Sequence, residues 1–277
     1  MRSLRDAAIS CLKKLIHWAM STRSGEKLLR LASEEREIYR HDRGVQRISA
    51  AVGARLGVRV LNGPFAGLTY PALTSAGSAL FPKILGSYEQ ELHPLVESLI
   101  ARGYSTIVNI GAAEGYYAVG LAIRVPQATV YAFEADPSSA GQLAALAAAN
   151  AVADRVITRG LCTAADLTAL HLTGRPLIIS DCEGAEVTLL DPRAVPALTM
   201  CDILLEFHPL RAADPYALFR ERFAATHEIE IIDVQPRNPG AYPALGFLSS
   251  VEREHVLFEG PRAVGWGFFR AKATANA

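Results

Sequence analysis

From Thr106 onward, short apolar runs rich in β-branched residues alternate with stretches of helix-forming residues. This alternation constrains the fold more than any other feature of the chain. A strand followed by a crossover helix lies parallel to the next strand, and a parallel sheet must be covered on both faces. The sequence therefore predicts an α/β fold with a doubly wound sheet of seven, mostly parallel strands. The predicted strands are 106–110, 129–133, 155–158, 177–180, 203–205, 228–234 and 265–270.

The stretches between the predicted strands contain helices, of which the Ala-rich run over 139–149 is the strongest helix former; we expect Asn150 to end it. Upstream of the sheet, we predict an N-terminal helical extension over 1–58 and a lead-in hairpin and helix over 59–100. The main α/β domain would then occupy 101–277.

The N-terminal extension contains apolar residues at every third or fourth position over 4–18, which predicts an amphipathic helix. We expect Ser24 and Gly25 to break this helix before a second one, which carries the charge run 34–37. Two interpretations of the first helix stay open. It caps its own domain, which we favour, or it is a basic helix that touches a membrane surface or the partner in a homodimer.

The composition limits the kinds of partner. Hydrophobic residues make up 50% of the 277 residues, which excludes a disordered or low-complexity chain. Lys and Arg number 28, as do Asp and Glu, so no bulk positive charge attracts nucleic acid, and we expect no such partner. The 4 cysteines contain no CxxC pair, which favours a reducing, cytoplasmic location over a disulfide framework. No apolar run is long enough to predict a transmembrane helix.

Candidate functional residues follow the predicted strands, because ligands of an open α/β sheet bind beyond the carboxyl ends of its strands. After the first strand, Gly111 and Gly115, with the small Ala113 between them, would let the backbone turn sharply and approach a ligand closely. Their spacing is GxAxG. It departs from the GxGxxG spacing of dinucleotide-binding loops.

The second predicted strand ends at Glu134. A carboxylate at this position of a doubly wound fold can accept hydrogen bonds from both hydroxyl groups of a ribose. The alternative is a solvated loop acid or a charge at a helix N-terminus, and Asp136 is the better candidate for that capping role.

Carboxylates and a histidine follow the fourth and fifth predicted strands. Asp181, Glu183 and Glu186 come directly after the fourth strand, and Glu206 and His208 end the fifth. A histidine beside acidic strand ends is a candidate general base. The carboxylates are also of the type that magnesium prefers, but nothing in the sequence fixes their geometry, and we predict no metal site.

Together these motifs resemble the class I S-adenosylmethionine-dependent methyltransferases, and within them the FkbM-type family. The family pattern has a turn D-x-G-A-x-x-G-Y-Y, a strand end A-F-E-P, a segment D-x-E-G-A-E and a later E-x-H. This chain carries matching residues in the same order at 109–117, 132–135, 181–186 and 206–208. The resemblance covers roughly residues 86–210 and implies a Rossmann-like methyltransferase fold.

The resemblance implies that the protein binds S-adenosylmethionine and transfers its methyl group to a small-molecule or sugar-like acceptor, by O-methylation. Because the sulfonium is already activated, the protein mainly has to align the acceptor with the methyl group and remove a proton. We predict that Asp181, Glu183 and His208 surround the acceptor, with His208 or Asp181 as the base. The residues predicted to bind the cofactor are Glu89, Asn109, Gly111, Ala113, Gly115, Glu134, Ala135 and Asp181.

Two residues depart from the family pattern. Asn109 stands where the family usually has an acid, and Leu161 or Cys162 occupies the region where many class I enzymes carry an aspartate for the adenine amino group. Adenine would then be held by backbone groups and apolar packing. These departures leave open the alternative that the protein has a methyltransferase-like fold but acts as a non-catalytic binding or scaffold module. An NAD-dependent oxidoreductase is a third alternative, favoured by Glu134 and opposed by the GxAxG spacing.

Tyr88 and Glu89 precede the region of the core. They would fold over the methionine end of the cofactor, where a carboxylate can pair with an ammonium group. They fit equally well a plain helix start that Ser87 caps, with Gln90 in its first turn.

Overall fold

A computed structural model of the chain describes residues 20–76, 79–170, 172–208, 214–259 and 265–272, together with Lys14 and Trp18. The chain divides into two compact units, Met1–Ala50 and Ala51–Ala277. The predicted three-part division, with boundaries at residues 58 and 100, stays a prediction. Within the described ranges, no helix is long and apolar enough to cross a membrane.

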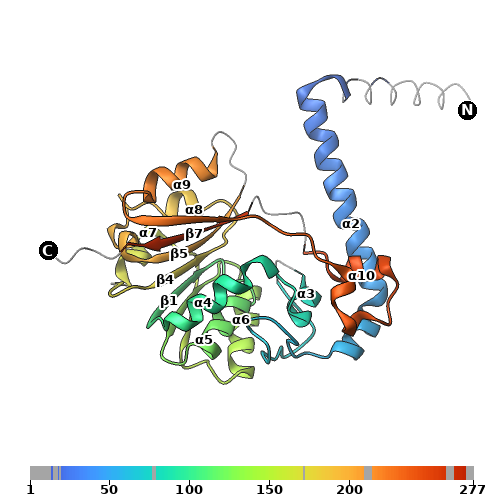
Figure 1. Cartoon of the computed structure of the whole chain (residues 1–277), viewed down its shortest axis with the longest axis horizontal. Coiled ribbons are helices and arrows are strands. Elements are labelled where there is room, and N and C mark those ends of the chain that lie inside the picture. Colours follow the sequence, from blue (N-terminus) through green and yellow to red (C-terminus); the bar gives the residue numbers. More distant parts are fainter. Residues whose placement is uncertain are drawn as a thin grey trace, which may run out of the picture. The chain divides into compact units, whose positions relative to one another are not determined.

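The second unit is built on a seven-stranded sheet (Figure 1). Its strands are β1 Thr106–Ile110, β2 Thr129–Phe133, β3 Val156–Arg159, β4 Leu177–Ser180, β5 Asp202–Phe207, β6 His227–Ile232 and β7 Gly265–Ala271. Their order is β3-β2-β1-β4-β5-β7-β6. The strands from β3 to β5 pair in parallel, whereas β7 is antiparallel to both β5 and β6. The predicted fold class is confirmed, and every predicted strand is present.

Helices cover both faces of this sheet. The helices of the described residues are α2 Arg23–Leu56, α3 Leu80–Leu85, α4 His93–Arg102, α5 Tyr116–Arg124, α6 Pro137–Ala149, α7 Ala164–Ala169, α8 Glu186–Leu189, α9 Pro215–Phe223 and α10 Ser250–Val256, with the 3₁₀ helices η1 Gln90–Leu92, η2 Pro196–Met200, η3 Pro239–Ala241 and η4 Pro243–Leu245. The helices α4, α5 and α6 lie on one face, and α8 and α9 lie on the other (Figure 1). This covering explains why the central strands are continuous apolar runs in the sequence.

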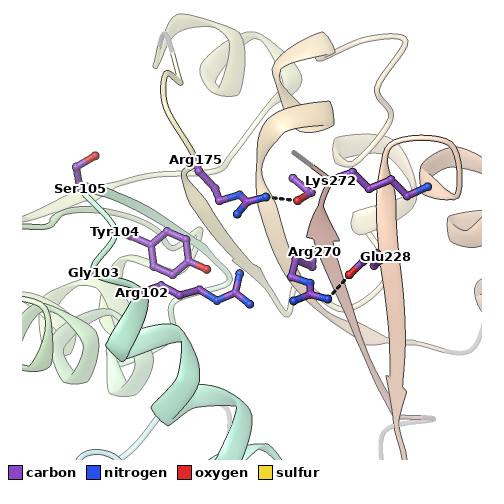
Figure 2. Close-up of a pocket in the computed structure, with 9 residues that line it drawn as sticks. Arg102, Gly103, Tyr104, Ser105, Arg175, Glu228, Arg270 and Lys272 are labelled. Carbon is purple, nitrogen blue, oxygen red and sulfur yellow. Dashed lines mark hydrogen bonds and ion pairs between the residues drawn. The ribbon is translucent and has the colours of Figure 1, made fainter. Parts of the chain in front are cut away.

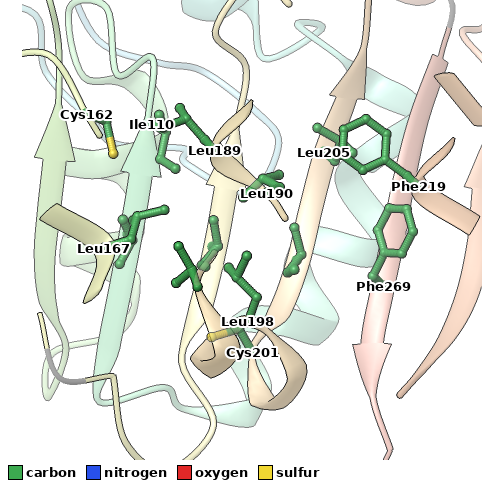
Figure 3. Packing of buried hydrophobic residues seen from close by; sticks show 14 of the residues in the cluster. Ile110, Cys162, Leu167, Leu189, Leu190, Leu198, Cys201, Leu205, Phe219 and Phe269 are labelled. Atoms are coloured by element: carbon green, nitrogen blue, oxygen red, sulfur yellow. The ribbon is translucent and has the colours of Figure 1, made fainter. Parts of the chain in front are cut away.

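One hydrophobic cluster fills the space between the sheet and the helices α7, α8 and α9 (Figure 3). Strand β4 is buried along its whole length, as expected of a central parallel strand that is covered on both faces. Packing of these side chains fixes the strands, and therefore the loops at their ends, relative to one another. Members of the cluster include Ile110, Leu167, Ile178, Leu189, Leu198, Leu205, Phe219, Phe223 and Phe269.

The helix α6 begins at Pro137, two residues before the predicted Ala-rich run, and ends where the sequence predicts. The side chain of Asp136 accepts a hydrogen bond of 2.7 Å from the Ser139 N–H at its start, so the capping role predicted for Asp136 is confirmed. The helix ends at Ala149, and Asn150 follows as the C-cap residue. The cap that Asp136 provides is favourable because the first N–H groups of a helix have no hydrogen-bond partner within the helix.

The predicted break at Ser24 and Gly25 is wrong. Both residues belong to the first turn of α2, which begins at Arg23. The interruption lies at Thr22, whose Oγ1 accepts a hydrogen bond of 3.0 Å from the Gly25 N–H. A threonine before a helix stabilises its start by this contact. The amphipathic helix predicted over 4–18 falls outside the described residues, apart from Lys14 and Trp18, which are helical.

The lead-in forms a tight turn with one bridge, where the sequence predicts a hairpin. A single antiparallel bridge joins Arg59 to Thr69, and the Val60 N–H donates to the Leu68 carbonyl oxygen at 2.8 Å. Asn150 closes this turn, since its Oδ1 accepts from the Thr69 N–H and its Nδ2 donates to the Thr69 carbonyl oxygen, both at 2.9 Å. The lead-in is thereby fixed to the end of α6.

Candidate active site

The turn after β1 packs directly against the turn after β4. Gly111 and Gly115 have φ angles of 75° and 98°, in the left-handed region that glycine adopts readily. A Cβ atom on Gly111 would lie 1.7 Å from the carbonyl oxygen of Asp181, so the two backbones can approach this closely only at a glycine. Ala113 has a φ of 47°, which residues with a side chain adopt uncommonly. The three predicted turn residues thus form a closely packed turn at the carboxyl edge of the sheet.

Glu134 connects this turn to the end of β2. Its Oε2 atom accepts a hydrogen bond of 2.7 Å from the Ala113 N–H, and its Oε1 atom accepts one of 2.7 Å from the Asp136 N–H. Each carboxylate oxygen can accept a further hydrogen bond. Glu134 is partly exposed, and the neighbouring Ala135 is exposed. A hydroxyl-bearing ligand can therefore reach Glu134 without displacing the backbone contacts that hold it.

Asn109 lies on β1 directly before the turn and is buried. In the sheet it is level with Ala132 of β2 and Ile179 of β4. Its Oδ1 atom has no hydrogen-bond partner among the described residues. A buried acceptor without a donor costs about 1–3 kcal/mol. The atom is therefore suited to a donor that a ligand supplies, such as an ammonium group.

His208, directly after β5, lies among four carboxylates. Its Nε2 atom is 3.5 Å from Asp181 Oδ1, 3.5 Å from Glu183 Oε2 and 3.6 Å from Glu206 Oε2. Its Nδ1 atom is 3.4 Å from Glu186 Oε1. The structure thus brings together the three residues predicted to surround an acceptor. Asp181, Glu206 and His208 also each offer one ligand atom within 4.8 Å of the others, a grouping that suits a shared proton or a divalent cation.

The protonation of this acid–histidine cluster follows from its burial. Burial, and then the neighbouring Asp181, raise the pKa of Glu206 far above its usual range, so Glu206 holds a proton at neutral pH. Burial lowers the pKa of His208, but Glu186, Asp181 and Glu183 outweigh this effect and raise it above the ordinary value. His208 therefore accepts a proton more readily than an exposed histidine does.

Glu183 and Glu186 differ in burial although both lie near His208. The Glu183 side chain is 90% exposed, whereas that of Glu186 is 3% exposed. The Glu186 carboxylate also accepts a hydrogen bond of 2.6 Å from the Cys182 N–H. Burial raises the pKa of Glu186, but His208 and the Cys182 N–H lower it more, so it stays ionised. Sequence reasoning gave Glu186 no role, although it lies in the predicted acidic segment.

Glu89 is buried at the start of η1. Its carboxylate accepts a hydrogen bond from the Tyr117 hydroxyl, and its own N–H donates to Glu259 Oε2 at 3.1 Å. Burial raises the pKa of Glu89 to about 8, although the Tyr117 hydrogen bond works against it. Ser87 does not cap a helix here, because its hydroxyl donates to the Pro82 carbonyl oxygen. The plain helix start predicted as the alternative is therefore wrong in its cap.

A buried ion-pair network holds the segment around Glu89, and sequence reasoning missed it. Arg237 pairs with Glu91 at 2.6 Å and with Glu259 at 2.7 Å, and Glu259 in turn accepts from the Glu89 N–H. The network connects η1 to the Pro/Gly-rich stretch 236–246. An arginine in such a stretch carries no local pattern that would reveal its partners.

A second buried ion pair joins Lys83 to Glu114, a residue of the glycine turn itself. Glu114 also accepts hydrogen bonds from the Tyr70 hydroxyl at 3.2 Å and the Ala76 N–H at 3.3 Å. The Lys83 Nζ atom lies 5.5 Å from the centre of the Tyr116 ring, a distance at which cation–π attraction acts. Sequence reasoning missed this pair too. The available signal was a single lysine within the apolar hexapeptide of α3.

The region after β3, predicted to meet adenine, presents one exposed apolar side chain. Leu161 is 73% exposed, whereas Cys162 is buried in the hydrophobic cluster. An exposed leucine at a strand end can cover a flat apolar ring. Of the two residues that the sequence offers there, Leu161 is the accessible one.

No protein-family model matches the chain, and no curated protein matches it. Among solved structures, the chain is similar to the O-methyltransferase TomG of Streptomyces achromogenes, which is involved in tomaymycin synthesis and was solved with SAM. The two chains are 16% identical with a TM-score of 0.45, and the match covers 68% of this chain and 82% of that one. It is similar to the O-methyltransferase of Bacillus cereus solved with SAH, at 18% identity and a TM-score of 0.42, covering 64% and 78%. A precorrin-6y C5,15-methyltransferase of Geobacter metallireducens matches at 14% identity and a TM-score of 0.41, covering 64% and 88%. The chemistry of the site has to be inferred from this chain's own residues.

Proposed function

We propose that the protein is a class I methyltransferase that uses S-adenosylmethionine to methylate a hydroxyl group of a small molecule. The observation that carries the proposal is the placement of the glycine turn, Glu134 and His208 after β1, β2 and β5. These are carboxyl ends of parallel strands in one sheet, where ligands of such folds bind. The resemblance of the motifs to the FkbM-type pattern supports the same function and the choice of an O-methyl acceptor.

The turn and the strand ends offer complementary groups along the length of the cofactor. Glu134 would accept hydrogen bonds from the ribose hydroxyls with the lone pairs that its backbone contacts leave free. The orphaned Oδ1 atom of Asn109 would accept from the ammonium group at the methionine end, and Glu89 would supply a counter-charge there. The exposed Leu161 would cover the adenine ring. When bound, S-adenosylmethionine supplies a methyl group on a positively charged sulfur.

The acid–histidine cluster would prepare the acceptor. Transfer would join the methyl carbon to the acceptor oxygen and would leave the electron pair of the broken carbon–sulfur bond on sulfur, so this chain's residues have to align the acceptor and take up its proton. The acceptor proton passes to Nε2 of His208. Glu186, 3.4 Å from Nδ1, would orient the imidazole and stabilise the imidazolium that forms. Asp181 and Glu183, both 3.5 Å from Nε2, are placed to contact the acceptor hydroxyl.

Calorimetry with S-adenosylmethionine and S-adenosylhomocysteine tests the cofactor assignment without knowledge of the acceptor. We expect the wild type to bind both compounds, and Glu134→Gln to weaken binding by about tenfold or more, because hydrogen bonds to a charged group are worth about 1.5–3 kcal/mol. Asp154→Asn is the matched control, since Asp154 is exposed and precedes β3 at the opposite edge of the sheet. Absence of binding by the wild type, or an equal loss in both variants, would contradict the proposal.

A further inference from the structure

A cavity of about 650 Å³ lies at the edge of the sheet opposite the candidate active site. The end of α4 and the residues before β1 form one wall, and Arg175, two residues before β4, strand β6 and the end of β7 form the rest (Figure 2). Pockets for small molecules in proteins commonly measure about 300–1,000 Å³. The lining residues are Arg102, Gly103, Tyr104, Ser105, Arg175, Glu228, Arg270, Ala271 and Lys272.

Positive charge dominates this basic cavity. Arg102, Arg175 and Arg270 reach it from three separate segments of the chain (Figure 2). Glu228 is the single carboxylate among the lining residues, and it pairs with Arg270. The fourth cation, Lys272, points its Nζ atom toward the end of α9, where it donates to the Ala224 carbonyl oxygen at 2.9 Å. Three guanidinium groups are therefore the cations available to a ligand.

The buried Asp202 fixes two of these arginines in place. Its Oδ2 atom accepts hydrogen bonds from Arg102 Nη1 at 3.0 Å and from the Tyr104 hydroxyl at 2.6 Å. Its Oδ1 atom accepts from the Ala271 N–H at 2.9 Å and lies 3.6 Å from Arg175 Nε. Asp202 is fully buried. The guanidinium groups are thus held by a rigid base, which lowers the entropy cost of ordering them around a ligand.

Most of the donors on these arginines face no acceptor within the described part of the chain. A guanidinium carries five N–H donors. Arg102 donates one to Asp202, Arg175 donates to the Ala271 carbonyl oxygen, and Arg270 donates to Glu228. Their side chains stay 30%, 45% and 49% exposed. The remaining donors, arranged as planar forks, match the oxygen spacing of phosphate groups.

We propose that this basic cavity is a binding site for a small molecule that carries two or more phosphate groups. The four cations of the lining outnumber Glu228 and the buried Asp202 by two charges, and this excess calls for more negative charge than one carboxylate or monoanion supplies. The Ser105 hydroxyl and the Tyr104 ring add a polar and an aromatic contact for the rest of such a molecule. The site is independent of the proposed methyl transfer, because it lies where β1 begins and the glycine turn lies where β1 ends.

Isothermal titration with inorganic pyrophosphate tests the proposal on the full chain. We expect the wild type to bind it and Arg270→Gln to weaken binding by about tenfold, because one charge-assisted contact is lost. Glu228→Gln should strengthen binding severalfold, since it removes the carboxylate that competes for Arg270. Both side chains are about half exposed, so neither change should disturb folding, which circular dichroism verifies.

Arg193→Gln is the matched control. It removes the same charge from a side chain that is 84% exposed and pairs with Asp191, away from the basic cavity. We expect its affinity for pyrophosphate to equal that of the wild type. The proposal is overturned if the wild type does not bind millimolar pyrophosphate, if Arg193→Gln weakens binding as much as Arg270→Gln, or if Glu228→Gln weakens it. Binding of S-adenosylhomocysteine should be unchanged in all three variants, which separates this site from the candidate active site.

Discussion

The backbone of Gly111 lies against the carbonyl of Asp181 so closely that a Cβ atom on Gly111 would come within 1.7 Å of the carbonyl oxygen. The contact joins the turn after β1, which would bind the cofactor, to the segment after β4, which would meet the acceptor. Because both partners are backbone atoms, neither can move away by changing a rotamer. The geometry of one half of the candidate site is therefore fixed by the other half.

Replacement of Gly111 by alanine should destabilise the protein strongly. Two costs add, because the left-handed φ strains an alanine and the new methyl group clashes with backbone. We expect the free energy of unfolding to fall by about 3 kcal/mol or more in urea denaturation. Gly184→Ala is the control: φ is 99° there, but a Cβ atom would meet nothing within 4 Å, so a loss of only about 1 kcal/mol is expected. Equal losses would show that the clash has no effect.

The buried pair of Lys83 and Glu114 should behave as a unit. Lys83→Met leaves a buried carboxylate without its counter-ion, which typically costs about 3–5 kcal/mol. Adding Glu114→Gln removes the charge and retains an acceptor for the Tyr70 hydroxyl and the Ala76 N–H. We therefore expect the double variant to be more stable than Lys83→Met alone in urea denaturation. Additive losses would contradict a direct interaction between the two side chains.

The sequence predicts the central strands well because they are buried on both faces. Strand β4 is apolar along its whole length and is bounded by Pro176 and Asp181, so its limits are visible without knowledge of its neighbours. The acidic and histidine residues could be grouped for a related reason, since the carboxyl ends of parallel strands meet at one edge. The pairwise geometry of these residues could not be predicted, because Glu183 is exposed and Glu186 is buried although they lie only three positions apart in the sequence.

Contacts between distant residues account for what the sequence did not reveal. Arg237 pairs with Glu91, and Lys83 pairs with Glu114; neither pair has a spacing that a local pattern could recognise. The alternative of a helix start capped by Ser87 is wrong in its cap for a local reason, since the Ser87 hydroxyl donates to the carbonyl oxygen of Pro82, five residues earlier. A buried polar residue needs a hydrogen-bond partner, but its own position in the sequence does not identify that partner.

Affinity for S-adenosylmethionine should rise with pH if Glu89 binds its ammonium group. Burial raises the pKa of Glu89 to about 8, so at neutral pH the free protein holds a proton there that the ammonium must displace. Binding at pH 7 should then release protons, and the affinity should increase toward about pH 8 as Glu89 ionises, above which loss of the ligand's own ammonium proton opposes a further rise. Calorimetry from pH 6 to 9 in buffers of different ionisation enthalpy measures both effects.

The matching control for this pH dependence is Glu89→Gln. It cannot titrate, so its affinity should stay low and nearly constant over the same pH range. Tyr117→Phe provides a second comparison, because it removes a hydrogen bond that lowers the pKa of Glu89. Its affinity should therefore level off at a higher pH than that of the wild type. An affinity of the wild type that does not change with pH would exclude Glu89 from the ammonium site.

Methyl transfer should not require a divalent cation. Asp181, Glu206 and His208 are close enough to share an ion, but burial favours the protonated form of Glu206 in the free protein, and a cation would have to displace that proton. A protonated carboxyl group is a poor ligand for magnesium, which binds ionised oxygen groups. We expect S-adenosylhomocysteine production to be the same after dialysis against EDTA as in added magnesium. A loss in EDTA that magnesium restores would assign the cluster to a metal.

Removal of the Glu186 charge should lower the pKa of His208. Burial lowers this pKa, and Glu186 is the first of the carboxylates that together raise it above the ordinary value. In Glu186→Gln we expect the midpoint of the His208 titration, followed by the NMR signal of its imidazole, to move down by about one pH unit. Glu183→Gln removes a carboxylate at nearly the same distance from the ring, 3.5 Å against 3.4 Å, but from an exposed side chain that solvent screens. The midpoint of the His208 titration should move much less in Glu183→Gln than in Glu186→Gln. Equal shifts in the two variants would mean that burial does not decide which carboxylate controls the proposed base.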